Sequence, residues 1–328
     1  MKVANAWSVP PSAATGRPMR ADQYGNGPPV VLLHGQPGSA LDWRQVVPLV
    51  CDEFTTIVPD RPGYGRTAGA AGGFAQNAVA LADLLDRFAV ERALLVGHSW
   101  GGGVALAFAR CFPHRTAGLV LAASVGPGER FGWEDRLLAA PLVGEGLAAL
   151  SLGVARRVLA SGWMRAIAER YLSGRAREAF NVLSGLTGAG TRAAVWRSFV
   201  VEQRALLVEL DGLASRLSDI TAPTEVINGS ADRVVPPHVA DRLAAGISGA
   251  AHTVLTGAHH LLLREHPDAV AAAVGRVGRR AWPKQSAGLD VEETTDGEVR
   301  AEESDTGPDD QQQEAGHNRL VGGDIQLP

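Results

Sequence analysis

The chain has 328 residues, enough for one large domain or two smaller ones, and its 45% hydrophobic content is ample for a buried core. Its formal net charge of −4 is uneven, because the segment from Pro283 to Pro328 holds twelve acidic and only three basic residues. No dense block of lysine or arginine is present, so the charge pattern gives no reason to expect a nucleic-acid partner.

Short apolar runs, which predict buried strands, alternate with helical patterns along the chain. The predicted strands cover residues 30–33, 56–58, 94–96, 119–121, 225–227 and 253–255. The clearest helical patterns between them span 74–88 and 104–111. This alternation predicts an α/β protein with a doubly wound, mostly parallel sheet covered by helices on both faces. In such sheets, binding and catalytic sites gather at the carboxyl ends of the strands.

One long interruption of the alternation predicts a helical cap. Residues 126–219 contain no convincing strand, and their amphipathic helical stretches fall at 133–140, 146–159, 163–171, 175–183 and 191–210. This insertion is too long for a simple crossover, so we expect an all-helical cap over the edge of the sheet. The core would then consist of two parts, 1–125 and 220–282, around the cap at 126–219. Residues 283–328 are polar and acidic, which predicts a disordered tail.

The most informative motif is Gly97-His98-Ser99-Trp100-Gly101, which lies between a predicted strand and a predicted helix. It matches the G-x-S-x-G pattern in the strand–turn–helix context that this pattern requires. Glycines two residues before and two residues after the serine avoid crowding in so sharp a turn. The motif predicts Ser99 as a nucleophile, although the pentapeptide alone also fits an ordinary tight turn.

Two further polar residues follow predicted strands and complete a candidate triad. His260 comes shortly after the strand at 253–255 and could remove the proton of Ser99. Asp232 comes shortly after the strand at 225–227 and could fix the tautomer of that histidine. Taken alone, each residue is also compatible with an ordinary surface loop or Asx turn. The chain order serine, aspartate, histidine, each past a strand, matches one hydrolase fold.

Acyl transfer also requires N–H donors for the oxyanion that develops in the transition state. We expect one donor from the backbone N–H of Trp100, the residue after the predicted nucleophile. The turn His34-Gly35-Gln36-Pro37-Gly38 directly follows the strand at 30–33. Its glycines let backbone amides approach a ligand, and the Gln36 N–H is the natural second donor.

On these motifs, the chain resembles the α/β-hydrolase fold superfamily over roughly residues 15–280. The turn at 34–38 resembles the HGxPG oxyanion loop of that family, and residues 59–67 resemble its D-x-P-G-x-G-x-S turn, with Thr67 in the last position. The resemblance implies an α/β-hydrolase fold with a cap. It also places the catalytic histidine at His260, with His259 where glycine is usual, and it gives Asp60 a structural role.

The identity of the nucleophile narrows the reaction. Members of the superfamily that cleave carbon–halogen bonds or epoxides place aspartate where this chain has Ser99, so those activities are disfavoured. Serine fits attack on an ester, lactone, thioester or amide carbonyl through an acyl-enzyme. We therefore predict a carboxylesterase-like serine hydrolase that needs no cofactor or metal and acts on a small to medium hydrophobic acyl substrate.

Three alternatives remain open. Carbon–carbon bond hydrolases of this superfamily also use serine, but their histidine is usually followed by tryptophan, whereas Leu261 follows His260. Proline iminopeptidases need acidic groups for a substrate amine, and the cap glutamates, Glu202 among them, cannot be given that role from sequence. A non-catalytic ligand-binding or scaffold member of the superfamily would belong to a different class of protein.

Other expectations concern the cap and the setting of the protein. We expect some of the cap aromatics to line an apolar pocket and others to pack the cap on the core; they are Trp133, Trp163, Phe180, Trp196 and Phe199. The residues show no basic cluster followed by an apolar run, and no apolar stretch long enough for a membrane span, so we expect neither a signal peptide nor a transmembrane helix. The two cysteines are isolated. We therefore expect a cytoplasmic monomer or homodimer.

Overall fold

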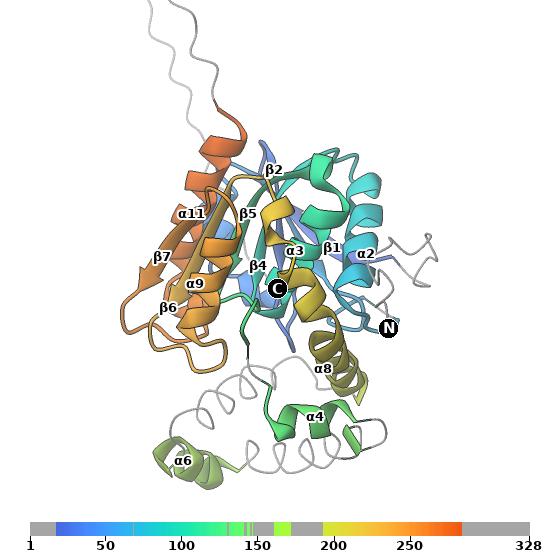
Figure 1. Cartoon of the computed structure of the whole chain (residues 1–328), viewed down its shortest axis with the longest axis vertical. Helices are drawn as coiled ribbons and strands as arrows, with labels where there is room; N and C mark the ends of the chain where they lie inside the picture. The colour runs from blue at the N-terminus through green and yellow to red at the C-terminus, as the bar shows by residue number, and fades with distance from the viewer. Residues whose placement is uncertain are drawn as a thin grey trace, which may run out of the picture. The chain divides into compact units, whose positions relative to one another are not determined.

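The fold is taken from a computed structural model of the chain (Figure 1). It describes residues 18–67, 69–129, 131–140, 143–144, 146, 161–171 and 193–283. The predicted tail lies outside them from residue 284 onward.

A seven-stranded sheet forms the centre of the fold, in the order β1-β3-β2-β4-β5-β6-β7. The strands are β1 (Arg20–Tyr24), β2 (Pro29–Leu33), β3 (Thr55–Asp60), β4 (Ala93–His98), β5 (Thr116–Ala122), β6 (Thr224–Gly229) and β7 (Ala251–Leu255). Of the described strands, only β1 runs antiparallel to its neighbour, and the other pairings are parallel. The carboxyl ends of β2, β4, β5 and β6 therefore meet at one edge of the sheet.

Helices cover both faces of the sheet (Figure 1). Those of the core are α1 (Val47–Val50), α2 (Phe74–Arg87), α3 (Trp100–Cys111), α9 (Pro237–Gly246), α10 (Leu262–Glu265) and α11 (Pro267–Ala281). Short 3₁₀ turns lie at Ala40–Trp43, Pro113–Arg115 and Leu217–Asp219. Helices α2, α3 and α9 bury side chains on one face, while α1, α10 and α11 bury theirs on the other.

Strand β2 shows why the sheet is buried on both sides. Val31 and Leu33 belong to the cluster with α2 and α3, whereas Val30 and Leu32 belong to the cluster with α11. Successive side chains of a strand point to opposite faces, so a continuous apolar run fits a strand that helices cover on both sides. The prediction of a doubly wound, mostly parallel sheet is confirmed.

All six predicted strands are present as β2 to β7. The structure adds β1, which the sequence analysis missed. Its sequence, Arg-Ala-Asp-Gln-Tyr, has almost no apolar run, and its side chains are exposed or half-buried. A strand at the edge of a sheet can remain polar because one side of it faces solvent.

Between β5 and β6, the structure describes helices α4 (Trp133–Ala139), α6 (Gly162–Tyr171) and α8 (Ala193–Ala214). They coincide with the stretches predicted at 133–140, 163–171 and 191–210. The stretches at 146–159, apart from residue 146, and at 175–183 lie outside the described residues. Helix α8 is tied to the core, since Leu206, Leu210 and Leu213 are buried in the same cluster as α2 and α3. The cap boundaries at 126 and 219 stay a prediction.

Among the described residues, no helix combines the length and apolar character that crossing a bilayer requires. In the same part of the chain, no group of three or more His, Cys, Asp or Glu side chains is placed to hold a metal ion.

Candidate active site

Ser99 lies in the sharp turn between β4 and α3. Its backbone has φ 52° and ψ −121°, a conformation that non-glycine residues rarely adopt. The turn is held from β5, because the Ser99 N–H donates to the Ala122 carbonyl at 3.0 Å and the Val125 N–H donates to the Ser99 carbonyl at 3.2 Å. The hydroxyl is thus presented at the amino end of α3, at the edge where the parallel strands end.

Glycine is required on both sides of this turn. A Cβ at Gly97 would lie 2.5 Å from the Gly101 carbonyl oxygen, and one at Gly101 would collide with the Leu33 carbonyl oxygen at the end of β2. Contacts this close to backbone atoms cannot be relieved by moving a side chain. The spacing of the two glycines therefore reflects the tight approach of β2, β4 and α3.

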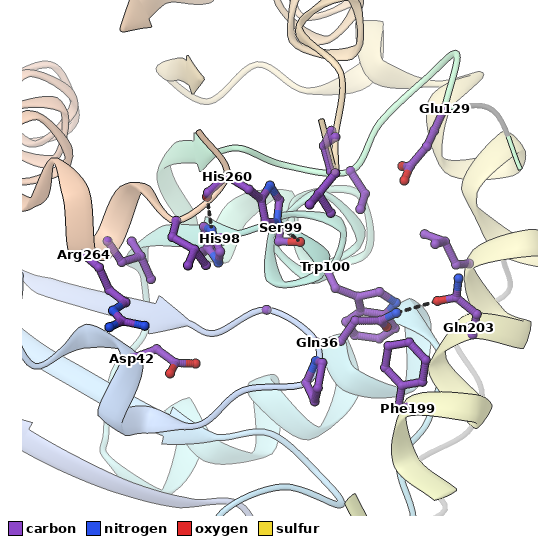
Figure 2. A pocket seen from close by; sticks show the side chains of 18 of the residues that line it. Gln36, Asp42, His98, Ser99, Trp100, Glu129, Phe199, Gln203, His260 and Arg264 are labelled. Carbon is purple, nitrogen blue, oxygen red and sulfur yellow. Dashed lines mark hydrogen bonds between the residues drawn. The ribbon is translucent and has the colours of Figure 1, made fainter. Parts of the chain in front are cut away.

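The structure brings the three predicted triad residues together. His260 Nε2 lies 3.0 Å from Ser99 Oγ, and His260 Nδ1 lies 2.8 Å from Asp232 Oδ2. All three residues are buried. Figure 2 shows the His260 ring directly above the Ser99 hydroxyl. The arrangement can pass a proton from Ser99 to the imidazole while the carboxylate faces the other ring nitrogen.

Asp232 is fixed by its own backbone turn. Its Oδ1 accepts hydrogen bonds from the N–H groups of Val234 and Val235, both at 2.9 Å. This leaves Oδ2 for the histidine. The loop of Asp232 is also joined to the loop of His260, because the Ala231 N–H donates to the Ala258 carbonyl at 2.9 Å. The carboxylate therefore has one oxygen for the backbone and one for the imidazole.

Two residues, His259 and Asp60, are alternatives in sequence to the predicted base and acid, but they lie in other surroundings. His259 is exposed, and its Nδ1 lies 3.8 Å from Glu265 Oε2. Asp60 accepts hydrogen bonds from the backbone N–H groups of Ala40 and Arg66, at 2.8 and 3.0 Å, so it braces the turn at 59–67. Of the two adjacent histidines, His260 is the one that meets Ser99.

The loop at 34–38 lies against the serine. A Cβ at Gly35 would be 3.1 Å from both the Ser99 Cβ and His98 Nδ1. Gln36 and Trp100, whose N–H groups are the two predicted oxyanion donors, line the same cavity as Ser99. The Trp100 N–H belongs to the first residue of α3, where backbone N–H groups lack partners within the helix.

A buried charged cluster behind this loop was not predicted. Arg61 and Glu202 are both 0% exposed and form an ion pair, and the Tyr64 hydroxyl donates to Glu202 Oε2 at 2.7 Å. Burial raises the pKa of Glu202, and the Arg61 guanidinium opposes this rise. Arg61 was visible in the turn motif at 59–67 and Glu202 among the cap glutamates, but nothing in the sequence joins two residues so far apart.

His98, next to Ser99, is hydrogen-bonded to the backbone of His260. Its Nε2 lies 3.0 Å from the His260 carbonyl oxygen, so it donates this hydrogen bond (Figure 2). Burial lowers the pKa of His98 to about 4, with repulsion from His260 as a further cause. The ring is therefore neutral in the folded protein at ordinary pH.

This buried histidine predicts acid sensitivity. The pKa of His98 is about 6.5 in the unfolded chain and about 4 in the folded protein. The neutral ring therefore contributes on the order of 3 kcal/mol to the free energy of unfolding. This contribution is complete above pH 6.5 and is lost as the pH falls to 4. Thermal unfolding of His98→Gln, which keeps a donor for the His260 carbonyl, should show a weaker decline between pH 6.5 and 4. The exposed control His114→Gln should follow the wild type, and an unchanged decline in His98→Gln would contradict the prediction.

A cavity of about 290 Å³ opens over Ser99. Its walls are mixed. Apolar side chains line it from the inserted segment (Phe131, Phe199 and Leu206) and from the Asp232 loop (Val234 and Val235). Polar side chains also line it, among them Gln36, Asp42, Gln203 and Arg264. Gln36 and Gln203 are joined by a 2.6 Å hydrogen bond (Figure 2). The volume suits a small to medium organic molecule.

The aromatic residues predicted for the cap differ in their positions: some lie at or beside the cavity and others are exposed. Phe199 lines the cavity, and Trp196 is buried beside it with the ring centroids 5.7 Å apart. Trp133 and Trp163 are instead 73% and 68% exposed, and neither lines the cavity. Phe180 lies outside the described residues. Of the four predicted cap aromatics that the structure describes, Phe199 alone lines the cavity.

The α/β-hydrolase class of proteins is defined by a parallel sheet with a buried serine at a strand–helix turn. In this class the serine faces a histidine and an aspartate that follow later strands. The sequence profile of the Alpha/beta hydrolase family matches residues 30–273. The chain belongs to this family.

Similar proteins differ in the activities for which they are named. The chain is 31% identical over 247 residues to a 2-hydroxy-6-oxononadienedioate/2-hydroxy-6-oxononatrienedioate hydrolase of Cupriavidus pinatubonensis, covering 73% of this chain and 83% of that protein. It is 28% identical over 269 residues to a haloalkane dehalogenase of Mesorhizobium japonicum, covering 76% and 84%. A thermophilic esterase from Thermogutta terrifontis matches in structure with a TM-score of 0.60 at 26% identity, over 80% of this chain and 93% of that one. The choice among these reactions rests on the residues of the site.

Proposed function

We propose that this protein is a serine hydrolase that cleaves a carboxylic ester or a related acyl bond of a small to medium substrate through an acyl-enzyme. The observation that carries the proposal is the Ser99–His260–Asp232 chain of contacts, at 3.0 and 2.8 Å, on the floor of a cavity. Similarity to the Thermogutta terrifontis esterase supports the same reaction class.

In the proposed reaction, His260 Nε2 takes the proton of Ser99 Oγ as the oxygen attacks the carbonyl carbon. The carbonyl oxygen becomes negative and is stabilised by the N–H groups of Gln36 and Trp100. The imidazolium then gives its proton to the departing alcohol, leaving an acyl-enzyme. Water attacks this ester with His260 again as the base, which releases the acid and restores Ser99.

The walls of the cavity support a partly hydrophobic substrate. Phe199, Leu206 and Val235 offer an apolar surface next to the serine, while Gln36 and Gln203 add a polar patch on the side of α8. The acyl or alcohol part of the substrate would lie along the apolar surface, where its burial contributes about 25 cal/mol per Å².

Cleavage of a carbon–carbon bond is the second candidate, favoured by the similarity to the Cupriavidus pinatubonensis hydrolase. The same triad would serve it. Dehalogenation is disfavoured despite the dehalogenase relative, because a serine oxygen attacking a carbon–halogen bond would leave an ether that water does not readily hydrolyse. The iminopeptidase alternative loses Glu202 as a ligand for a substrate amine, since that carboxylate is engaged by Arg61 and Tyr64.

The proposal predicts turnover of p-nitrophenyl acetate or butyrate and labelling of Ser99 by a fluorophosphonate probe. Ser99→Ala should lose the label and lower turnover by at least about 10³-fold, because the nucleophile is absent. Peptide mass mapping of the labelled wild type should place the probe on Ser99 and leave the nearby buried Ser124 unmodified.

A vinylogous 1,5-diketone assayed beside the two esters separates the two candidates. Preference for the ester supports the proposed reaction, and preference for the diketone supports carbon–carbon cleavage. A wild-type protein that neither labels nor turns over any of these compounds would show that the chain is a non-catalytic member of its family.

A further inference from the structure

We infer that Arg61 and Glu202 position the peptide group between Gly35 and Gln36, and so connect the oxyanion hole to helix α8. The inference rests on the proposed function, in which the Gln36 N–H stabilises the oxyanion. Neither Arg61 nor Glu202 lines the cavity or contacts Ser99, so both are positioning residues.

The first observation is the set of hydrogen bonds on the Gly35 carbonyl oxygen. It accepts one from Arg61 Nη2 at 2.7 Å and one from His34 Nδ1 at 2.9 Å. The tautomer of His34 is fixed, because its Nε2 accepts the Arg61 backbone N–H at 3.0 Å and the proton must therefore be on Nδ1. Arg61 Nε also donates to the His34 carbonyl at 2.9 Å. Two successive peptide groups of the loop are thus held from behind.

The Gly35 carbonyl and the Gln36 N–H belong to one planar peptide group and point in opposite directions when the group is trans. Donors on the carbonyl side therefore leave the N–H side directed away from Arg61. Hydrogen bonds to the carbonyl oxygen polarise the shared π system and strengthen the N–H as a donor. Arg61 and His34 thus fix the direction of the Gln36 N–H and increase its strength.

Glu202 allows the guanidinium to occupy this position. Arg61 is fully buried, with its Cζ 4.5 Å from the centroid of the Trp100 ring and 4.9 Å from that of Tyr64. A buried guanidinium without a partner would be strongly destabilising. Both carboxylate oxygens of Glu202 accept from it, and the Tyr64 hydroxyl binds the same carboxylate.

The carboxylate comes from a different part of the chain than the loop it supports. Glu202 lies on α8, in the segment inserted between β5 and β6, and is 141 residues from Arg61 in sequence. One turn earlier on α8, the Ser198 hydroxyl donates to the Gly63 carbonyl at 2.9 Å. A shift of α8 would therefore displace Arg61 and, through it, the Gly35–Gln36 peptide.

Arg61→Lys tests the inference, because lysine keeps a cation for Glu202 but loses the planar fork that reaches the carboxylate and two carbonyls together. With p-nitrophenyl butyrate, we expect kcat to fall about 10–100-fold. This decrease is no larger than the decrease in kcat expected when an oxyanion donor is removed altogether. KM should change less than about threefold. Affinity for a trifluoromethyl ketone, to which Ser99 adds to form an oxyanion, should fall by the same factor as kcat/KM.

Two further variants separate positioning from anchoring. Ser198→Ala removes another, half-buried hydrogen bond between α8 and the core. It leaves the Gly35–Gln36 peptide untouched, so it should lower the melting temperature while kcat stays within about twofold of wild type. Glu202→Gln keeps the size of the side chain and one acceptor oxygen but removes the charge, and it should lower kcat about 3–10-fold.

The outcomes are distinguishable from a failure of the proposed function. If the wild type is active but Arg61→Lys and Glu202→Gln keep both kcat and analogue affinity within about twofold, the pair only anchors α8 and the inference is wrong. If Arg61→Lys does not fold, Glu202→Gln decides by the same two measurements. A wild type without ester turnover or labelling of Ser99 would overturn the proposed function instead.

Discussion

Asp232→Asn should lower kcat for p-nitrophenyl butyrate about 10⁴-fold while the protein stays folded. The substitution is nearly isosteric, and the carboxylate is buried between the backbone N–H groups of Val234 and Val235 and the ring of His260. The expected loss comes from the tautomer of the imidazole and not from a gap in the packing.

The geometry determines which tautomer results. The side-chain oxygen of the new asparagine must face the two backbone N–H groups, which leaves its NH₂ group toward His260 Nδ1. That nitrogen must then accept a hydrogen bond, so the proton moves to Nε2, which faces Ser99 Oγ at 3.0 Å. A protonated Nε2 cannot remove the proton of the serine.

His259→Ala is the matched control for this loop, because the residue is exposed and adjacent to His260 but turned away from Ser99. It should keep kcat within about twofold of wild type. A decrease of less than about tenfold in Asp232→Asn would mean that Asp232 does not orient the base. Circular dichroism and the melting temperature of both variants verify that the fold is intact.

The sequence predicted those parts of the site that follow from local pattern. Four apolar runs end at the loops that hold Gln36, Ser99, Asp232 and His260, and parallel strands bring such ends to one edge. Each site residue could therefore be located without knowing any long-range contact. The glycines around Ser99 added the shape of the turn.

Other features depend on contacts that local pattern does not encode. Strand β1 is polar because it lies at an edge, so it has no apolar run to identify it. Arg61 and Glu202 are charged, and charged residues are usually exposed; only the fold shows that both are fully buried against each other. The exposure of Trp133 and Trp163 likewise depends on how α4 and α6 are turned, which hydrophobicity alone does not determine.

Gly101→Ala should strongly destabilise the turn that holds Ser99. A Cβ there would collide with the Leu33 carbonyl oxygen and lie 2.5 Å from the His34 carbonyl oxygen. Both atoms are backbone, so α3 must move away from the end of β2. We expect a loss of about 3 kcal/mol, seen as a decrease of roughly 5–10 °C in melting temperature.

The same substitution at Gly275 should stabilise the protein instead of destabilising it. Gly275 lies within α11, where a Cβ would approach only the flexible end of Arg279, at 3.3 Å. Alanine in a helix interior is favoured over glycine by about 0.5–1 kcal/mol, so Gly275→Ala should raise the melting temperature slightly. Because the displaced carbonyl of His34 begins the oxyanion loop, Gly101→Ala should also lower kcat, whereas Gly275→Ala should not. Equal melting temperatures for the two variants would show that the turn can accept a side chain at position 101.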